Sequence, residues 1–136
     1  MEGFFVFHLA CNLAKEAKGK VHALYVIEVE RALPLDAEIP EETSRGEEVL
    51  ANIEGMARES KCPLTAEILQ CRQAGPAIIQ EAITKQAALI VLGVPYKRSL
   101  NGAHLGDTTT FILQNATCPV LMWHNGTSEQ TPLVRS

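Results

Sequence analysis

Two glycines frame the segment of this chain whose residue types could bind a phosphate group. Gly93 ends an apolar run, a loop follows, and Gly106 opens a stretch with the apolar spacing of a helix. Glycine lets a backbone approach a ligand closely, and the free N–H groups at the start of a helix attract anions. The segment from Gly93 to Thr108 therefore suits a phosphate site, although loop glycines serve simple turns far more often.

Residue patterns for catalysis or metal binding are missing from the sequence. The histidines are scattered, Ser99 has no Gly-x-Ser-x-Gly motif around it, and no cysteine spacing fits a zinc site. The residues concerned are His8, His22, His104 and His124, with Cys11, Cys62, Cys71 and Cys118. We expect no catalytic residue and no metal site. The cysteines should be reduced, small apolar side chains in or near the core, which fits a cytoplasmic location.

Length and charge narrow the function classes further. The chain has 136 residues and a net charge of −4, which suits one domain and argues against nucleic acid as a partner. No apolar run is long enough to cross a bilayer, and the N-terminus lacks the basic start of a secretion signal. We expect a domain over residues 1–124, followed by a disordered polar tail over residues 125–136.

Hydrophobic periodicity predicts alternating helices and strands. The spacing predicts helices over 3–18, 41–60, 76–86 and 106–115, and strands over 21–27, 64–71, 88–92 and 119–123. The second helix carries an apolar stripe that includes Leu50, Ile53 and Ala57. Alternation of this kind predicts a parallel sheet covered by helices on both faces, with strands 64–71 and 119–123 at its edges. Ligands of such sheets bind where the strands end, here after Ile27 and Leu92.

The order of these elements and several motifs resemble the universal stress protein family. The family has a strand followed by Gly-x-x-Gly, nine residues and then Gly-Ser or Gly-Thr. This sequence has a similar pattern: Ile90-Val-Leu-Gly93, two residues, Tyr96, nine residues and then Gly106-Asp107. Ala116 to Leu121 contains the closing Cys-Pro-Val, Gly75-Pro76 resembles the opening of the preceding helix, and Leu24 to Ile27 resembles the second strand. The likeness runs from Leu9 to Trp123. It implies a three-layer α/β/α fold of the adenine nucleotide alpha hydrolase type, with about five parallel strands.

The resemblance also implies a site for an adenine nucleotide such as ATP. The matching positions are Val26, which would meet the adenine, and Leu92, Gly93, Gly106, Asp107 and Thr108, which would hold the ribose and phosphates. Two positions depart from the family. Tyr96 replaces the second motif glycine, and Asp107 replaces a serine or threonine and brings a negative charge to the phosphate position. Asp107 is, conversely, a good helix N-cap.

The family's first strand, which is central in the order 3-2-1-4-5 and ends in an aspartate, has no evident counterpart. Three explanations are open. Phe4 to Phe7 could form a short substitute strand, a partner chain could fill the gap, or the gene could begin upstream. The spacing of Phe4, Phe7 and Cys11 favours a helix for this segment. In each case the first strand of the fold is missing or degenerate.

From these features we expect a regulatory or interaction module of the stress response whose adenine-nucleotide binding is weak or lost. The alternative is an ATP-binding, nucleotide-dependent sensor. ATP hydrolysis has the least support, because the sequence has no Walker lysine motif. The resemblance implies a homodimer through Val120 to Trp123, and we expect a protein partner, no nucleic acid and no insertion into membranes.

Overall fold

The computed structural model describes residues 2–94 and 106–124. In chain order, the described residues form α1 (Glu2–Ala17), β1 (Val21–Glu28), α2 (Pro40–Ser60), β2 (Leu64–Cys71), α3 (Ala74–Thr84), β3 (Ile90–Val94), α4 (Gly106–Asn115) and β4 (Val120–His124). The alternation of helices and strands is therefore as predicted. Residues 125–136, for which disorder is predicted, and the loop that contains Tyr96 lie outside the described residues.

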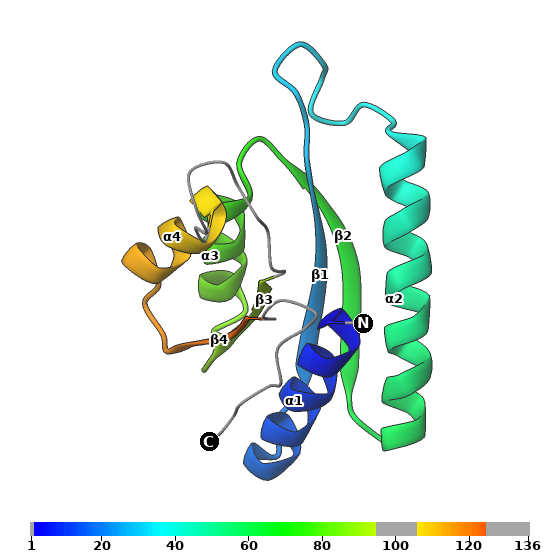
Figure 1. The fold of residues 1–136 in the computed structure, drawn as a ribbon, viewed down its shortest axis with the longest axis vertical. Helices are drawn as coiled ribbons and strands as arrows, with labels where there is room; N and C mark the ends of the chain where they lie inside the picture. The colour runs from blue at the N-terminus through cyan, green and yellow to red at the C-terminus, as the bar shows by residue number, and fades with distance from the viewer. Residues whose placement is uncertain (1, 95–105, 125–136) are drawn as a thin grey trace, which may run out of the picture.

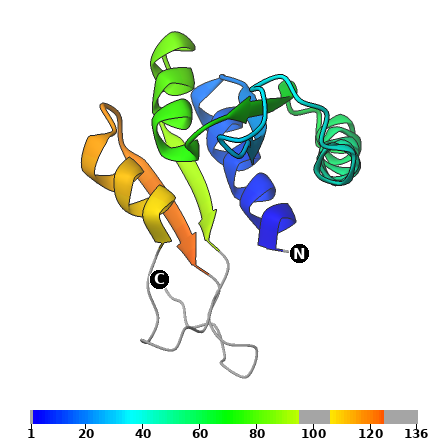
Figure 2. The ribbon, with the colours of Figure 1, turned by 90° about the horizontal axis from the view of Figure 1, so that it is seen from above.

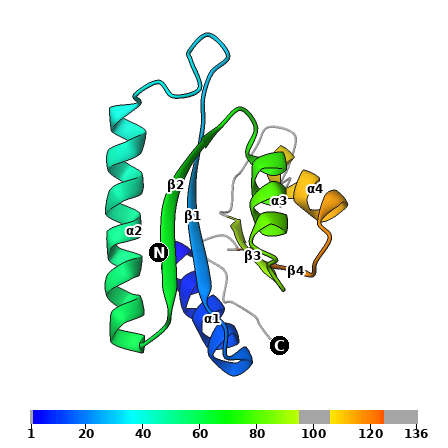
Figure 3. The same ribbon diagram turned by 180° about the vertical axis from the view of Figure 1, so that it is seen from behind.

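The strands form two separate parallel pairs. β1 pairs with β2 from Val21↔Leu64 to Glu28↔Cys71, and β3 pairs with β4 from Ile90↔Val120 to Val94↔His124. Figures 1 and 3 show the two pairs standing apart. In the described part of the chain, each of the four strands has one partner strand. Four strands are present there, and no fifth joins the two pairs.

Helices cover both faces of the strands, which confirms the three-layer α/β/α arrangement. α1 contacts α2, β1 and β3, whereas α3 packs against α4 and β1. Figure 2 shows α1 and α2 on one side of the strands and α3 and α4 on the other. The predicted stripe of α2 is confirmed, because Leu50, Ile53 and Ala57 are buried against the sheet.

The N-terminal segment is helical. Phe4 to Phe7 lie within α1, so the substitute strand is not formed and the helical interpretation of this segment is correct. Phe7 is buried in a cluster with Cys11, Ile53 and Ala57, which explains why the segment keeps helical spacing. The predicted strand 88–92 instead begins at Ile90 and runs to Val94. Ala88 is exposed, and Ile90 is the residue whose N–H donates to Pro119 O, at 3.0 Å.

A disulfide links Cys11 of α1 to Cys62, which follows α2. The prediction of four reduced cysteines is therefore wrong for this pair, although both residues are buried as expected, at 2% and 6% exposure. The two residues are 51 positions apart in the sequence, so no local spacing predicted that they would pair. The packing of α1 beside α2 brings their Cα atoms to 6.0 Å from each other. Cys71 and Cys118 are free thiols and half-buried.

Candidate functional site

The candidate nucleotide residues come from three elements, β1, β3 and α4. Val26 lies near the end of β1, Leu92 and Gly93 lie in β3, and Gly106 opens α4. Figure 2 shows the start of α4 beside the ends of β3 and β4. The edge at which parallel strands end is the usual ligand edge of an open α/β sheet. Tyr96 and His104, which belong to the same motif loop, lie outside the described residues.

The first turn of α4 combines a left-handed glycine with a negative charge. Gly106 has φ +87°, a conformation that glycine adopts without steric cost. Asp107 is exposed in the first turn, Thr108 is half-buried and Thr109 is buried. A carboxylate here interacts favourably with the positive end of the helix dipole. The same carboxylate would repel a phosphate approaching the helix start.

The position of α4 is held by its contact with α3. A Cβ built on Gly75 would stand 2.9 Å from Cδ1 of Phe111 and 3.0 Å from its Cβ, so only glycine allows this approach. Ile112 is completely buried on the same helix. The predicted Gly75-Pro76 opening of α3 therefore has a packing role against α4.

Polar side chains at the ends of β1 and β2 form hydrogen bonds with the backbone of neighbouring segments. Glu28 Oε2 accepts a hydrogen bond from the Ala74 backbone N–H at 2.7 Å, which satisfies a donor at the start of α3. Arg72 donates to the carbonyls of Val29 and Glu30, at 3.3 and 2.6 Å. Gln70 donates to the carbonyls of Leu35 and Ala37, at 2.8 and 3.0 Å. These contacts were not predicted, because their partners are 33 to 46 positions apart in sequence.

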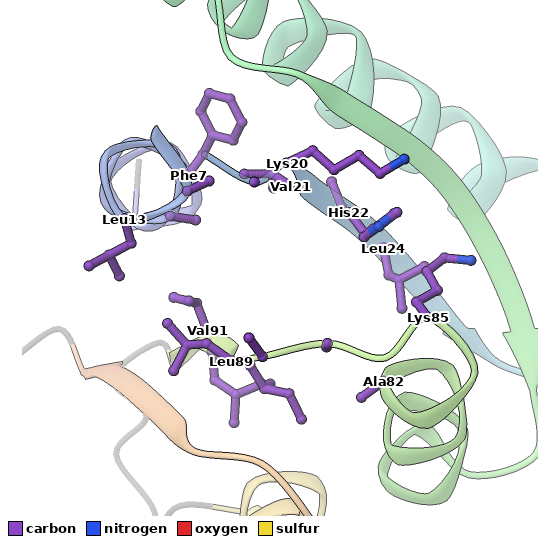
Figure 4. Close-up of a pocket in the computed structure, with 18 of the residues that line it drawn as sticks. Phe7, Leu13, Lys20, Val21, His22, Leu24, Ala82, Lys85, Leu89 and Val91 are labelled. Atoms are coloured by element: carbon purple, nitrogen blue, oxygen red, sulfur yellow. The ribbon is translucent and has the colours of Figure 1, made fainter. Parts of the chain in front are cut away.

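A cavity of about 510 Å³ separates β1 from β3. Figure 4 shows Phe7 and Leu13 of α1, Leu24 of β1 and Leu89 and Val91 beside or in β3 around this space. Val26 and Leu92, the two apolar candidates for the nucleotide site, line opposite walls of the same cavity. The wall is mainly apolar along its length, and its charged residues are Lys20, Glu81 and Lys85.

The two clearest pKa shifts belong to residues of the sheet. Burial, followed by the charges of Lys20 and Lys85, lowers the pKa of His22 below its ordinary value of 6.5, against the opposing effect of two glutamates. Its Nδ1 lies 2.5 Å from Thr65 Oγ1, so His22 has a structural partner on β2. Burial and then Glu28 raise the pKa of the Cys71 thiol above 9.0. His22 and Cys71 thus lie on the paired strands β1 and β2, outside the predicted nucleotide positions.

Two further searches concern the described residues alone. Within the described ranges, no group of three histidine, cysteine or acidic side chains could hold a metal ion. No helix of residues 2–94 or 106–124 has the length and apolar character needed to span a bilayer.

The alternating helices and parallel strands define a layered α/β domain, and comparison with known proteins gives the family. The model of the universal stress protein family matches residues 5–124, so the chain belongs to that family. A universal stress protein of Methanocaldococcus jannaschii is 34% identical over 119 residues, which cover 83% of this chain and 69% of that protein.

Solved structures of the family share the fold. The universal stress protein of Archaeoglobus fulgidus in complex with dAMP has a TM-score of 0.67 and 16% identity, with 86% of this chain and 83% of that chain covered. A universal stress protein family member of Arabidopsis thaliana with AMP bound has a TM-score of 0.59 and 19% identity, with 91% and 78% covered. The resemblance drawn from the sequence is thereby confirmed at the level of family and fold.

Proposed function

We propose that this protein is a regulatory or interaction module of the stress response in which adenine-nucleotide binding is weak or lost. The observation that carries the proposal is the position of Asp107, exposed in the first turn of α4. An incoming phosphate would meet this carboxylate instead of a neutral hydroxyl. Two like charges about 4 Å apart repel by about 1 kcal/mol even in bulk water, and by more at a partly buried site.

The second candidate is an ATP-binding sensor. Two observations favour it: solved structures of the family contain dAMP or AMP, and Val26 and Leu92, two of the matching positions, line one cavity. In this case the backbone N–H groups at the start of α4 would hold phosphate strongly enough to tolerate Asp107.

Calorimetric titration with ATP and Mg²⁺ separates the two candidates. We expect wild-type protein to bind with a Kd weaker than about 100 μM, or about −5.5 kcal/mol. Asp107→Ser, alone and combined with Tyr96→Gly, should tighten binding about tenfold or more. Glu41→Ser is the matched control, because Glu41 is an exposed carboxylate in the first turn of α2. Wild-type binding much tighter than 100 μM would support the sensor and contradict the proposal.

The proposal includes a homodimer and assigns no catalytic residue. β4 is an edge strand within the described part of the chain, and Leu121 on it is 38% exposed, which supports pairing with a second copy. The absence of a Walker lysine motif from the sequence argues against ATP hydrolysis of the P-loop type. A cytoplasmic location and a protein partner are also parts of this proposal.

A further inference from the structure

We propose that the disulfide between Cys11 and Cys62 is a redox-responsive site, which a dithiol reductant opens by attacking the sulfur of Cys62. The bond joins α1 to the turn between α2 and β2, so its redox state sets how firmly α1 is held on the domain. The inference goes beyond the nucleotide question, because it uses neither Asp107 nor the motif loop. It adds a modification site to the proposed regulatory module.

The core shields both sulfurs from most directions. Cys11 and Cys62 are buried in one apolar cluster with Phe7, Ile53 and Ala57. The rate of thiol–disulfide exchange depends on access to the attacked sulfur, so a buried bond reacts slowly unless one sulfur has an approach route. The location of such a route decides which of the two cysteines is attacked.

A groove provides an approach route to Cys62. It has a volume of about 620 Å³ and lies at the C-terminal end of α2, where the chain turns into β2 (Figure 1). Cys62 lines the groove together with residues of α2, the turn and the start of β2: Glu54, Ala57, Arg58, Lys61, Pro63 and Leu64. Among the described residues, none of α1 lines it, and Cys11 belongs to α1. A nucleophile that enters this groove therefore meets Cys62, and Cys11 becomes the leaving group.

The charge of the groove suits a thiolate, which is the attacking species in thiol–disulfide exchange. Arg58 and Lys61 are exposed cations in its lining, and Glu54 is the acidic residue there. Two cations and one carboxylate leave a net positive charge beside Cys62. Such a field raises the local concentration of an anionic thiol and favours its thiolate form.

The exchange takes place in two steps. In the first, a thiolate of the reductant forms a bond to Cys62 Sγ, the protein S–S bond breaks, and its electron pair leaves on the Cys11 sulfur, which takes up a proton. In the second, the other thiolate of the reductant attacks the reductant sulfur bonded to Cys62, and Cys62 leaves and is protonated. The dithiol is thereby oxidised to its disulfide, and the protein gains two electrons and two protons.

The fold has a place for both reduced thiols. Cys62 Sγ lies 3.7 Å from Pro63 O, so the S–H of the reduced residue has an acceptor in position. Cys11 becomes a small apolar side chain beside Phe7 and Ile53. Because the apolar cluster is retained, reduction removes the covalent link to α1 without placing an unpaired charge in the core. We therefore expect the reduced domain to stay folded while α1 opens locally more often.

The cytoplasmic location proposed above favours a responsive bond over a purely structural one. Disulfides are rare in reducing compartments, and those that occur there are usually transient, in catalysis or in redox sensing. On that proposal, the bond between Cys11 and Cys62 is made under oxidising stress and opened when reductant is restored.

Mass spectrometry identifies the attacked sulfur. Oxidised full-length protein is treated briefly with the anionic monothiol mercaptoethanesulfonate, and the reaction is stopped with excess N-ethylmaleimide in denaturant. We expect the monothiol on Cys62 as a mixed disulfide and maleimide on Cys11. The reverse labelling pattern would overturn the proposal. So would a folded protein in which an oxidant does not form this bond.

Variants without the groove cations test the approach route. The measured quantity is the ratio of the reduction rate by mercaptoethanesulfonate to that by the cationic monothiol cysteamine, because this ratio cancels changes in general access. Arg58→Gln combined with Lys61→Gln should lower the ratio about threefold or more at low ionic strength. Lys15→Gln is the matched control: like Arg58 it removes a cation from the last turn of a helix, but on α1, one turn after Cys11. An unchanged ratio in the double variant, or an equal fall in the control, would contradict attack through the groove.

Hydrogen exchange tests the consequence for α1. Reduction with dithiothreitol should speed amide exchange in α1 by about tenfold or more, with a much smaller change in α4. Cys11→Ser should exchange like the reduced protein whether or not reductant is present. Exchange in α1 that is equal in the oxidised and reduced proteins would overturn the proposal that the bond holds this helix. Neither ATP nor Asp107 enters these measurements, so their outcome is independent of the nucleotide proposal.

Discussion

Gly46 of α2 lies directly against the ring of Tyr25 in β1. A Cβ added to this glycine would stand 2.7 Å from Cδ1 and 3.1 Å from Cε1 and Cγ of the tyrosine. The Tyr25 hydroxyl in turn donates to Glu42 Oε1 at 3.5 Å, one turn earlier on α2. The close approach of helix and strand at this point depends on the missing side chain.

Gly46→Ala should therefore destabilise the domain. The clash with a ring whose hydroxyl contacts Glu42 should cost about 1–3 kcal/mol, which outweighs the gain in helix propensity of about 1 kcal/mol. Gly55→Ala on the same helix is the matched control. Its nearest neighbour is Arg58 Nη2, at 3.8 Å, so it should stabilise by about 0.5–1 kcal/mol. Urea unfolding measures both; equal stabilisation by the two alanines would contradict the packing argument.

The disulfide between Cys11 and Cys62 should stabilise the folded state by restricting the unfolded chain. With a sequence separation of 51 between the cysteines, the loop-entropy estimate is about 4 kcal/mol. We expect reductant to lower the melting temperature by about 10 °C or more, at about 2–4 °C per kcal/mol for a chain of this size. Cys71→Ser is the control, because Cys71 is a free thiol, and its melting should respond to reductant as wild type does. A melting temperature insensitive to reductant would show that the bond does not form in solution.

Sequence reasoning predicted the elements well because their signals are local. The stripe of Leu50, Ile53 and Ala57 repeats at helical spacing, and the Gly75-Pro76 and Cys118-Pro119 motifs mark where the next elements begin. The order of these elements was sufficient to predict the family and the layered fold. At the candidate site, the glycines could be placed on the strand and helix ends for the same reason.

Contacts between distant segments could not be predicted. These contacts depend on how the helices pack against the rest of the fold. The pairs are Cys11 with Cys62, Glu28 with Ala74, and Gly46 with Tyr25. A single sequence gives no spacing rule for such pairs.

Cys71 should react slowly with thiolate-selective reagents at neutral pH. Burial, followed by the charge of Glu28, raises its pKa above 9.0, so the thiol stays protonated to higher pH than a free cysteine. Its alkylation rate should rise most steeply above pH 9. Glu28→Gln should shift that rise to somewhat lower pH while leaving the burial effect. The measurement is the rate of iodoacetamide labelling at Cys71, resolved by peptide mass spectrometry from labelling at Cys118. A profile at Cys71 identical to that of a free cysteine would contradict the assignment.

His22 should make the folded state sensitive to acid. Its pKa is lowered in the fold by burial and by Lys20 and Lys85, so the native protein resists protonation that the unfolded chain accepts. The stability contributed by neutral His22 is present above pH 6.5 and is lost as the pH falls through the lowered pKa of the folded state. His22→Gln keeps a hydrogen-bonding side chain for Thr65 without titrating. The free energy of unfolding of wild type should fall relative to that of the variant between pH 7.5 and pH 5; parallel curves would contradict this.

Leu121 tests the proposed homodimer. It is 38% exposed on β4, whose outer edge has no partner strand among residues 2–94 and 106–124. Pairing of two such edges would cover Leu121 and join the two sheets across a two-fold axis. We expect wild-type protein to scatter light as a dimer at micromolar concentration, and Leu121→Lys to convert it to a monomer by placing a charge in the contact. Leu113→Lys is the control, since Leu113 is similarly exposed, at 46%, but lies on α4. A monomeric wild type, or a dimer that Leu121→Lys leaves intact, would exclude this edge as the interface and leave β4 free to bind a different chain.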